Sequence, residues 1–184
     1  MAQSWRVKQD SARKPRPPLD KEGLERLALF YAGRYATTRA KLRQYLKRKV
    51  VERGWGGESA PPINALVEKL AGLRYVDDKA FAASRGAALT RRGFGERRVG
   101  DALKAAGIDP EDAAPAREEA RESAWTSALR FAERRRLGPY AAAAHDQAGR
   151  QKAIGAMLRA GHPMDLVRRI LNASPGEIPD SDGR

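Results

Sequence analysis

Three short segments of this chain repeat one helical pattern at a nearly constant interval. They read TTRAKLRQYLKRK, GERRVGDALKAAG and GRQKAIGAMLRAG, and the same two apolar positions recur in each as Leu42 and Leu46, Val99 and Leu103, and Ala153 and Met157. The intervals between the segments are 57 and 54 residues. A spacing of four places both positions on one helical face. The pattern indicates a tandem repeat, although short helices rich in alanine and leucine can also match by chance.

Capping residues and glycines divide the units into helices. Asp20, Thr38 and Asp77 each precede a segment with apolar residues at helical spacing, and their side chains suit the N-cap position. The turn at 93–95 separates two helices of the central unit, because glycine adopts backbone angles that end a helix. Gly107 is placed to end the second of these in a Schellman motif, in which a left-handed residue follows the helix.

Two prolines predict where the second unit ends and the third begins. A helix is expected to start at Pro110, and Pro115 lies where it would continue. Because a proline inside a helix removes a backbone hydrogen bond, we expect a break or bend near Ala114, followed by a long amphipathic segment through Trp125. The predicted organisation is a flexible basic tail over residues 1–18, three-helix units over residues 19–74, 75–116 and 117–173, and a disordered end over residues 174–184.

The composition predicts an all-α fold of elongated shape. Alanine and leucine dominate the apolar residues, aromatic residues make up 7% of the chain, and runs of β-branched residues are nearly absent. One unit of three short helices buries little apolar surface, so neighbouring units must stack. We therefore expect tandem three-helix repeats in a curved row.

The charge of the chain favours a polyanionic partner. The formal net charge is +13, which suits nucleic acid or an acidic protein surface. The chain has no cysteine, so disulfides and thiolate metal sites are excluded. No segment approaches the roughly 20 apolar residues that span a bilayer, and the basic N-terminus lacks the apolar region of a signal peptide. We expect a cytoplasmic protein with no membrane contact.

The sequence carries no pattern that predicts catalysis or metal binding. Asp77 and Asp78 could act as paired carboxylates, but helix capping accounts for both, with Asp78 adding negative charge to the same helix end. His145 and His162 lack ligand-like neighbours, so we expect solvated side chains, with His162 a candidate N-cap. The turn at 93–95 lacks the strand and the lysine of a phosphate-binding loop. The sequence predicts no enzyme, no cofactor and no metal.

Three basic clusters are candidate contacts for a partner or a phosphate. Arginines flank the turn at 93–95, with Phe94 between them, next to the N-terminus of a helix that could help to hold an anion. The alternative is a solvated basic corner. Two further runs lie near helix C-termini, where positive charge is favourable without a ligand. The candidate residues are Arg91, Arg92, Arg97, Arg98, Lys47, Arg48, Lys49, Arg134, Arg135 and Arg136.

The residues of the central unit resemble a known family. The segment 73–82, LRYVDDKAFA, is similar to a signature of the RecX family of bacterial regulators, in which a hydrophobic residue, an aromatic residue and an Asp-Asp pair precede an aromatic-Ala pair. The segment 97–108 is similar to the family's "RI..EL...GI" pattern. The resemblance covers residues 19–173, and the third unit departs from it at 159–162. Its structural motif residues are Tyr75, Asp77, Asp78, Phe81 and Gly107.

The resemblance implies both a fold and a function. The fold is a row of tandem three-helix repeats. The function is binding to the RecA nucleoprotein filament and inhibition of its recombinase, ATPase and coprotease activities, which modulates DNA repair and the SOS response. The protein would act as a monomer, with direct DNA contact left open. The alternative is a sequence-independent DNA- or RNA-binding protein with helix-turn-helix-like units and no RecA partner.

Overall fold

The computed structural model describes residues 17–180, and within that range the secondary structure is helical. The only β-type pairing there is an isolated bridge between Leu19 and Trp55. The predicted all-α fold is confirmed. The predicted tail lies outside the described residues except for Pro17 and Pro18, as do the last four residues of the predicted disordered end. Residues 174–180 follow the last helix without forming another.

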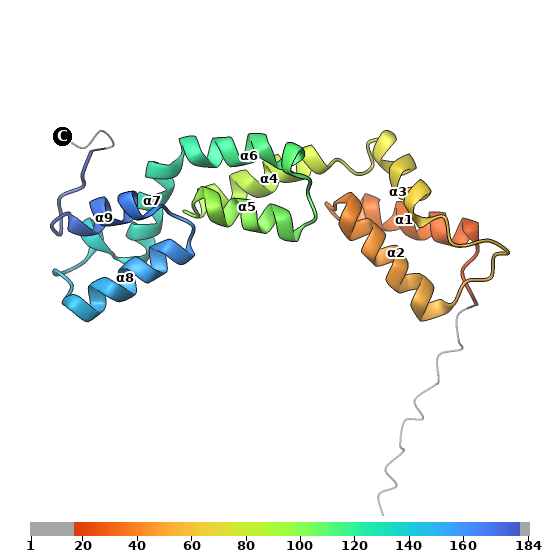
Figure 1. Ribbon diagram of the computed structural model, residues 1–184, viewed down its shortest axis with the longest axis horizontal. Coiled ribbons are helices and arrows are strands. Elements are labelled where there is room, and N and C mark those ends of the chain that lie inside the picture. The colour runs from red at the N-terminus through yellow and green to blue at the C-terminus, as the bar shows by residue number, and fades with distance from the viewer. Residues whose placement is uncertain (1–16, 181–184) are drawn as a thin grey trace, which may run out of the picture.

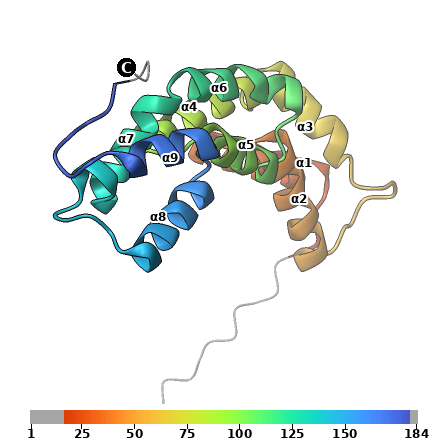
Figure 2. The ribbon, with the colours of Figure 1, turned by 60° about the vertical axis from the view of Figure 1, so that its left-hand side comes forward.

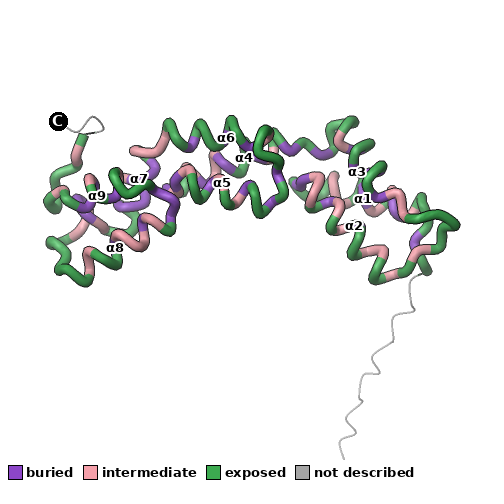
Figure 3. The backbone as a smooth tube through the Cα atoms, viewed as in Figure 1, coloured by how far each residue is buried: buried purple, intermediate pink, exposed green. Residues whose placement is uncertain are grey.

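The helices form three successive groups, each with its own hydrophobic core. The first unit contains α1 (Lys21–Arg34), α2 (Arg39–Arg53) and α3 (Ile63–Gly72). The second unit contains α4 (Asp78–Arg91), α5 (Glu96–Ala105) and α6 (Pro110–Glu122). The third unit contains α7 (Ala124–Arg135), the 3₁₀ turn η1 (Gly138–Tyr140), α8 (Gln147–Arg159) and α9 (Met164–Asn172). Figure 3 shows buried residues within each of the three groups.

The predicted N-caps are confirmed. Oδ1 of Asp20 accepts from the Gly23 N–H at 2.7 Å, and Oδ1 of Asp77 accepts from the Ala80 N–H at 2.9 Å. Oγ1 of Thr38 accepts from the backbone N–H three residues later at 3.1 Å. Each side chain satisfies a donor that the first helical turn leaves without a backbone partner.

The predicted end of the second helix in the central unit is also confirmed. Gly107 has φ of +71°, and its N–H donates to the Lys104 carbonyl at 2.9 Å. The Ile108 N–H donates to the Leu103 carbonyl at 3.1 Å, which completes a Schellman motif. A chain reversal at this place brings the start of α6 back over α4.

The repeat register agrees with the structure. The six aligned residues lie on α2, α5 and α8, the middle helix of each unit, and all are buried within their unit: Leu42, Leu46, Val99, Leu103, Ala153 and Met157. The same face of each middle helix therefore forms the core of its unit.

Of the break or bend predicted near Ala114, the break does not occur. Helix α6 continues through Pro115 to Glu122, and the chain breaks at Ser123, so the boundary expected at residue 116 falls inside α6. The face of α6 that carries Ala116 is buried against α4, where a Cβ added to Gly86 would lie 3.0 Å from the Ala116 Cβ. This close packing outweighs the one hydrogen bond that the proline removes.

The three units form an elongated, curved molecule, as predicted. Figure 1 shows them side by side along the longest axis, with α6 above α4 and α5. Helices α2 and α8 project from the same side at the two ends, which gives the molecule the outline of an arch, and Figure 2 shows the same arrangement from another direction.

Candidate functional site

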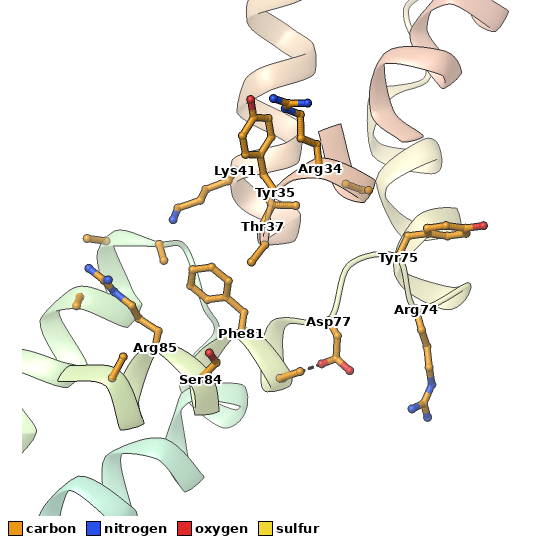
Figure 4. A pocket seen from close by; sticks show the side chains of 18 of the residues that line it. Arg34, Tyr35, Thr37, Lys41, Arg74, Tyr75, Asp77, Phe81, Ser84 and Arg85 are labelled. Atoms are coloured by element: carbon orange, nitrogen blue, oxygen red, sulfur yellow. Dashed lines mark hydrogen bonds between the residues drawn. The ribbon is translucent and has the colours of Figure 1, made fainter. Parts of the chain in front are cut away.

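A cleft of about 990 Å³ lies between the first and second units. One wall consists of the end of α1, the loop that follows it and the start of α2 (32–37 and Lys41). The other wall consists of residues in the turn before α4, which are Arg74, Tyr75 and Asp77, together with residues of α4 and α5. Figure 4 shows side chains from both units around this space. The cleft exists because two repeats stack, so no single unit contains it.

Two hydrogen bonds, one buried and one partly buried, join the units beside this cleft. Oγ1 of Thr38 donates to the Ala106 carbonyl at 2.7 Å, and Oδ1 of Asp78 accepts from the Arg39 N–H at 2.9 Å. Both side chains are buried, with Thr38 fully inaccessible and Asp78 5% exposed. These bonds connect the N-terminus of α2 to the end of α5 and the start of α4. We name these four residues the latch.

The latch gives separate roles to the two adjacent aspartates. Asp77 caps its own helix, α4, whereas Asp78 also satisfies a donor at the start of α2. Burial raises the pKa of the Asp78 carboxyl, and the hydrogen bond from Arg39 opposes that effect. Capping therefore accounts for both aspartates, but one of them caps a helix of the neighbouring unit.

The cleft is lined by more basic than acidic residues. Its basic residues form no ion pair and no side-chain hydrogen bond within residues 17–180, and they are Arg34, Lys41, Arg74, Arg85 and Arg98. Elsewhere, basic side chains pair across helices, as Arg117 does with Glu96 at 2.6 Å. The acidic residues of the cleft are Asp77, which caps α4, and Asp101. The cleft therefore favours an anionic ligand.

Three aromatic side chains also line the cleft. Tyr35 is 50% exposed and Tyr75 is 53% exposed, whereas Phe81 is half-buried. The Lys41 ammonium lies 4.8 Å from the centroid of the Phe81 ring, and the Arg34 guanidinium lies 5.9 Å from that of Tyr35. Cations at these distances interact favourably with aromatic rings. Figure 4 shows Tyr35 and Tyr75 on different elements around the cleft.

The four arginines around the turn at 93–95 are all exposed, but they do not lie around one site. Arg98 lines the cleft toward the first unit. Arg97 reaches the third unit, where it donates to the Leu158 carbonyl. The Arg92 guanidinium lies 5.6 Å from the Phe94 ring, and Arg91 is exposed at the end of α4. Neither Arg91 nor Arg92 lines the cleft.

The other two basic runs lie outside the cleft. On α2, Arg48 and Lys49 pair with Glu52 and lie 5.7 and 5.8 Å from the Tyr45 ring, while Lys47 is exposed. The other run lies at the end of α7, where Arg134, Arg135 and Arg136 are all exposed. The Arg135 guanidinium lies 5.8 Å from the centroid of the Phe131 ring, and Arg136 adopts φ of +54°. Their roles as partner contacts stay predictions.

A second junction joins the central unit to the third. The N–H of Gly95 donates to the Ala160 carbonyl at 2.9 Å, and Nε2 of His162 lies 3.0 Å from the Gly93 carbonyl oxygen. His162 is 2% exposed and follows the end of α8, so the expectation of a solvated or capping residue is wrong for it. His145 is exposed, as expected. Burial lowers the pKa of His162.

The sequence reasoning missed most of the cleft. Arg34, Arg74 and Arg85 were not selected because they stand alone in the sequence rather than in basic runs. They come together only when α1, α3 and α4 meet across the junction. The exposed tyrosines after two helix ends, Tyr35 and Tyr75, were the available signal, because an aromatic residue outside the apolar face of a helix often marks a binding surface.

No group of three or more histidine, cysteine or acidic residues in the described part of the chain is arranged to hold a metal ion. Among residues 17–180, no helix combines the length and the apolar character that a bilayer-spanning segment needs.

Comparisons with known proteins find similarity to proteins named RecX. The chain is 28% identical over 160 residues to a protein named regulatory protein RecX from Myxococcus xanthus, across 83% of this chain and 86% of that protein. Its fold is similar to the crystal structure of RecX from Lactobacillus salivarius, with a TM-score of 0.59, 21% identity and coverage of 82% and 94% of the two chains. A second RecX crystal structure has a TM-score of 0.58, 20% identity and coverage of 83% and 73%. No protein-family model matches the chain.

Proposed function

We propose that this chain, which is similar to RecX proteins in sequence and in fold, regulates the RecA recombinase by binding the RecA–DNA filament and inhibiting its recombinase, ATPase and coprotease activities. The site of this regulation is the cytoplasm. RecA modulation in turn limits recombinational repair and the SOS response.

The observation that carries this proposal is the match to a RecX protein along most of both chains, together with the conserved outline of the fold. The arch and the charge of +13 add physical support. A stacked helical repeat offers a long curved surface for binding, and a strong positive charge accelerates capture of an anionic polymer. No step of this function requires a nucleophile or a cofactor from the chain.

A titration of the chain into RecA assembled on single-stranded DNA tests the proposal. We expect the rate of ATP hydrolysis by RecA to fall as the chain is added, and the chain to co-sediment with the filaments. An unchanged hydrolysis rate and no co-sedimentation would contradict the proposal. Binding to bare DNA with equal affinity in the presence and absence of RecA would favour the sequence-independent nucleic-acid-binding alternative.

We further propose that Arg91 and Arg92 contact the filament. Both are exposed, neither lines the cleft, and neither takes part in the hydrogen bonds of the second junction. Replacing both with alanine should weaken filament binding by about tenfold, since hydrogen bonds to charged groups contribute about 1.5–3 kcal/mol each before solvent screening. Arg97 is left unchanged because its bond to Leu158 supports the fold.

The control variant for this experiment removes two positive charges elsewhere. Arg26 and Arg121 pair with Glu22 and Glu118 on exposed helix faces. Their double replacement by alanine changes the net charge equally, so we expect it to retain filament binding within about twofold. If the two double variants lose equal affinity, Arg91 and Arg92 contribute only to the overall charge.

A further inference from the structure

We propose that Trp125 and Arg169 of the third unit form a binding surface for an extended acidic peptide of a partner protein, and that residues 174–180 of this chain occupy that surface as an autoinhibitory strap. The inference does not depend on whether the partner is RecA. Three observations carry it: the contacts that hold the strap, its separation from the hydrophobic core, and the charges on the two sides.

The strap turns back along the third unit after α9. Gly176 has φ of +90°, and its N–H donates to the Pro139 carbonyl at 2.8 Å. Further along, the Arg169 guanidinium donates to the Asp180 carbonyl. Figure 2 shows the segment after α9 running back past α7 toward the C-terminus. Both contacts use backbone groups of the strap, so another peptide with the same spacing of donor and acceptor can make them.

Arg169 and Trp125 together present a donor group at the protein surface. The Arg169 guanidinium lies 4.4 Å from the centroid of the Trp125 ring, and both side chains are half-buried. An aromatic ring attracts a cation over its face, which holds the guanidinium plane in position. The N–H groups of a guanidinium point outward in its own plane, where a carbonyl or a carboxylate accepts from them. The Asp180 carbonyl fills this acceptor position in the structure.

The strap can leave this surface without unfolding the third unit. Within residues 17–180, the core of that unit includes no residue beyond Leu171. Ile178, the large apolar residue of the strap, is 57% exposed. Ser174 and Pro175, where the strap begins, border a cavity of about 260 Å³. A segment that buries so little apolar surface opens at a small cost in free energy.

The charges on the two sides are complementary. Residues 124–173 contain nine basic and three acidic residues, whereas the two charged residues of the strap, Glu177 and Asp180, are both acidic. Neither carboxylate forms an ion pair within residues 17–180, so they interact with the third unit only through its overall field. A partner peptide with more carboxylates gains more from the same field and can displace the strap.

The same contacts favour a peptide over a nucleic acid. The Pro139 carbonyl accepts from a backbone N–H, and the phosphodiester backbone of a nucleic acid has no donor to replace it. A peptide carries both a donor and an acceptor on each residue other than proline, so it can satisfy Arg169 and Pro139 together. An acidic peptide is therefore the partner class that this surface selects.

The test measures the fluorescence anisotropy of a fluorescein-labelled peptide that copies residues 174–180, with the full-length chain. Gly176→Pro releases the strap, because proline has no N–H for the Pro139 carbonyl and cannot adopt a positive φ. No atom lies within 4 Å of a Cβ added at Gly176, so a Cβ there causes no clash. We expect this variant to bind the peptide at least about fivefold more tightly than the unmodified chain, the factor that one backbone hydrogen bond contributes to strap closure.

Arg169→Ala, made in the Gly176→Pro chain, should weaken peptide binding by about tenfold, because a charge-assisted hydrogen bond is lost. Arg159→Ala in the same chain is the matched control, since it removes an exposed arginine of the same unit and should change the affinity by less than about twofold. Arg169→Lys keeps the charge and the apolar stem but not the planar group, so it should lose at least about threefold. Urea denaturation of each variant separates loss of binding from loss of folding.

Two results would overturn the proposal directly. Equal or undetectable peptide binding by the Gly176→Pro and unmodified chains would show that the strap does not occupy a peptide site. Equal losses in the Arg169→Ala and Arg159→Ala chains would show that only net charge matters. If release of the strap tightened binding of a labelled oligothymidine but not of the peptide, the surface would belong to a nucleic acid instead. None of these results bears on the RecA proposal, which is tested with assembled filaments.

Discussion

At the scale of single residues, His162 shows how burial changes the chemistry of a side chain. Its ring packs 5.7 Å from that of Phe131, and Nε2 donates to the Gly93 carbonyl oxygen. The second ring nitrogen, Nδ1, is buried and has no hydrogen-bond partner in the described part of the chain. Protonation would place a charged N–H there without an acceptor. The folded protein therefore favours the neutral ring.

This burial predicts a loss of stability in mild acid. The pKa of His162 is lower in the folded chain than the ordinary value of 6.5, so its contribution to stability is present above about pH 6.5 and is lost as the pH falls below it. The free energy of unfolding in urea should fall by at most about 1.4 kcal/mol per pH unit from this group.

His162→Gln should reduce that pH dependence, since glutamine stays neutral and keeps a donor for Gly93. His145→Gln is the matched control: His145 is exposed, and its replacement should leave the pH profile of the unmodified chain. An identical pH profile in the His162 variant would show that other groups cause the acid sensitivity.

At the scale of helices, the pair α4 and α6 depends on small residues. Gly86 and Ala116 face each other, and the space beside Gly86 is also bounded by Val99 of α5. Small residues at such positions allow helix backbones to approach closely. This contact is also the reason that α6 persists through Pro115, because shortening the helix would expose Ala116 and Ala120.

Gly86→Val should therefore destabilise the second unit. The added side chain would force α4 and α6 apart, at a cost of about 1–3 kcal/mol in the free energy of unfolding. Ala116→Gly in the same chain removes the Cβ that the valine meets and should restore part of the loss. Additive destabilisation by the two changes, measured by urea denaturation, would contradict direct packing between these positions.

At the scale of the whole molecule, the junctions determine the curvature. The latch fixes the first unit on the second, and Gly107 allows the close approach there, because a Cβ at this residue would overlap the Cβ of Ala40. At the second junction, a Cβ at Gly95 would overlap the carbonyl oxygen of Gly161. Each junction therefore depends on a glycine whose lack of a side chain lets the neighbouring unit approach its backbone.

Gly107→Ala should open the first junction as well as strain the backbone. Its positive φ alone costs about 1–2 kcal/mol for alanine, and the overlap with Ala40 adds to that cost. We expect a lower free energy of unfolding and a changed radius of gyration by small-angle X-ray scattering. Gly72→Ala is the control, because no atom lies within 4 Å of the added Cβ. Equal scattering profiles for Gly107→Ala and the unmodified chain would exclude a role in curvature.

The sequence by itself determined the local structure. Caps such as Asp20 and the Schellman glycine Gly107 were predictable because their hydrogen bonds join residues close together in the chain. The buried faces of α2, α5 and α8 were predictable because the period of the helix fixes which residues share a face. The segment 73–82 also carried a resemblance to RecX proteins that the comparisons found again over most of the chain.

Only the tertiary structure decided what happens between units. The continuation of α6 through Pro115, the role of Asp78 at the start of α2 and the burial of His162 all depend on a neighbouring helix. The cleft likewise combines residues from 32–41, 74–88 and 98–106. The energy of such contacts depends on how whole units dock, and a pattern along one helix contains no information on the register of that docking.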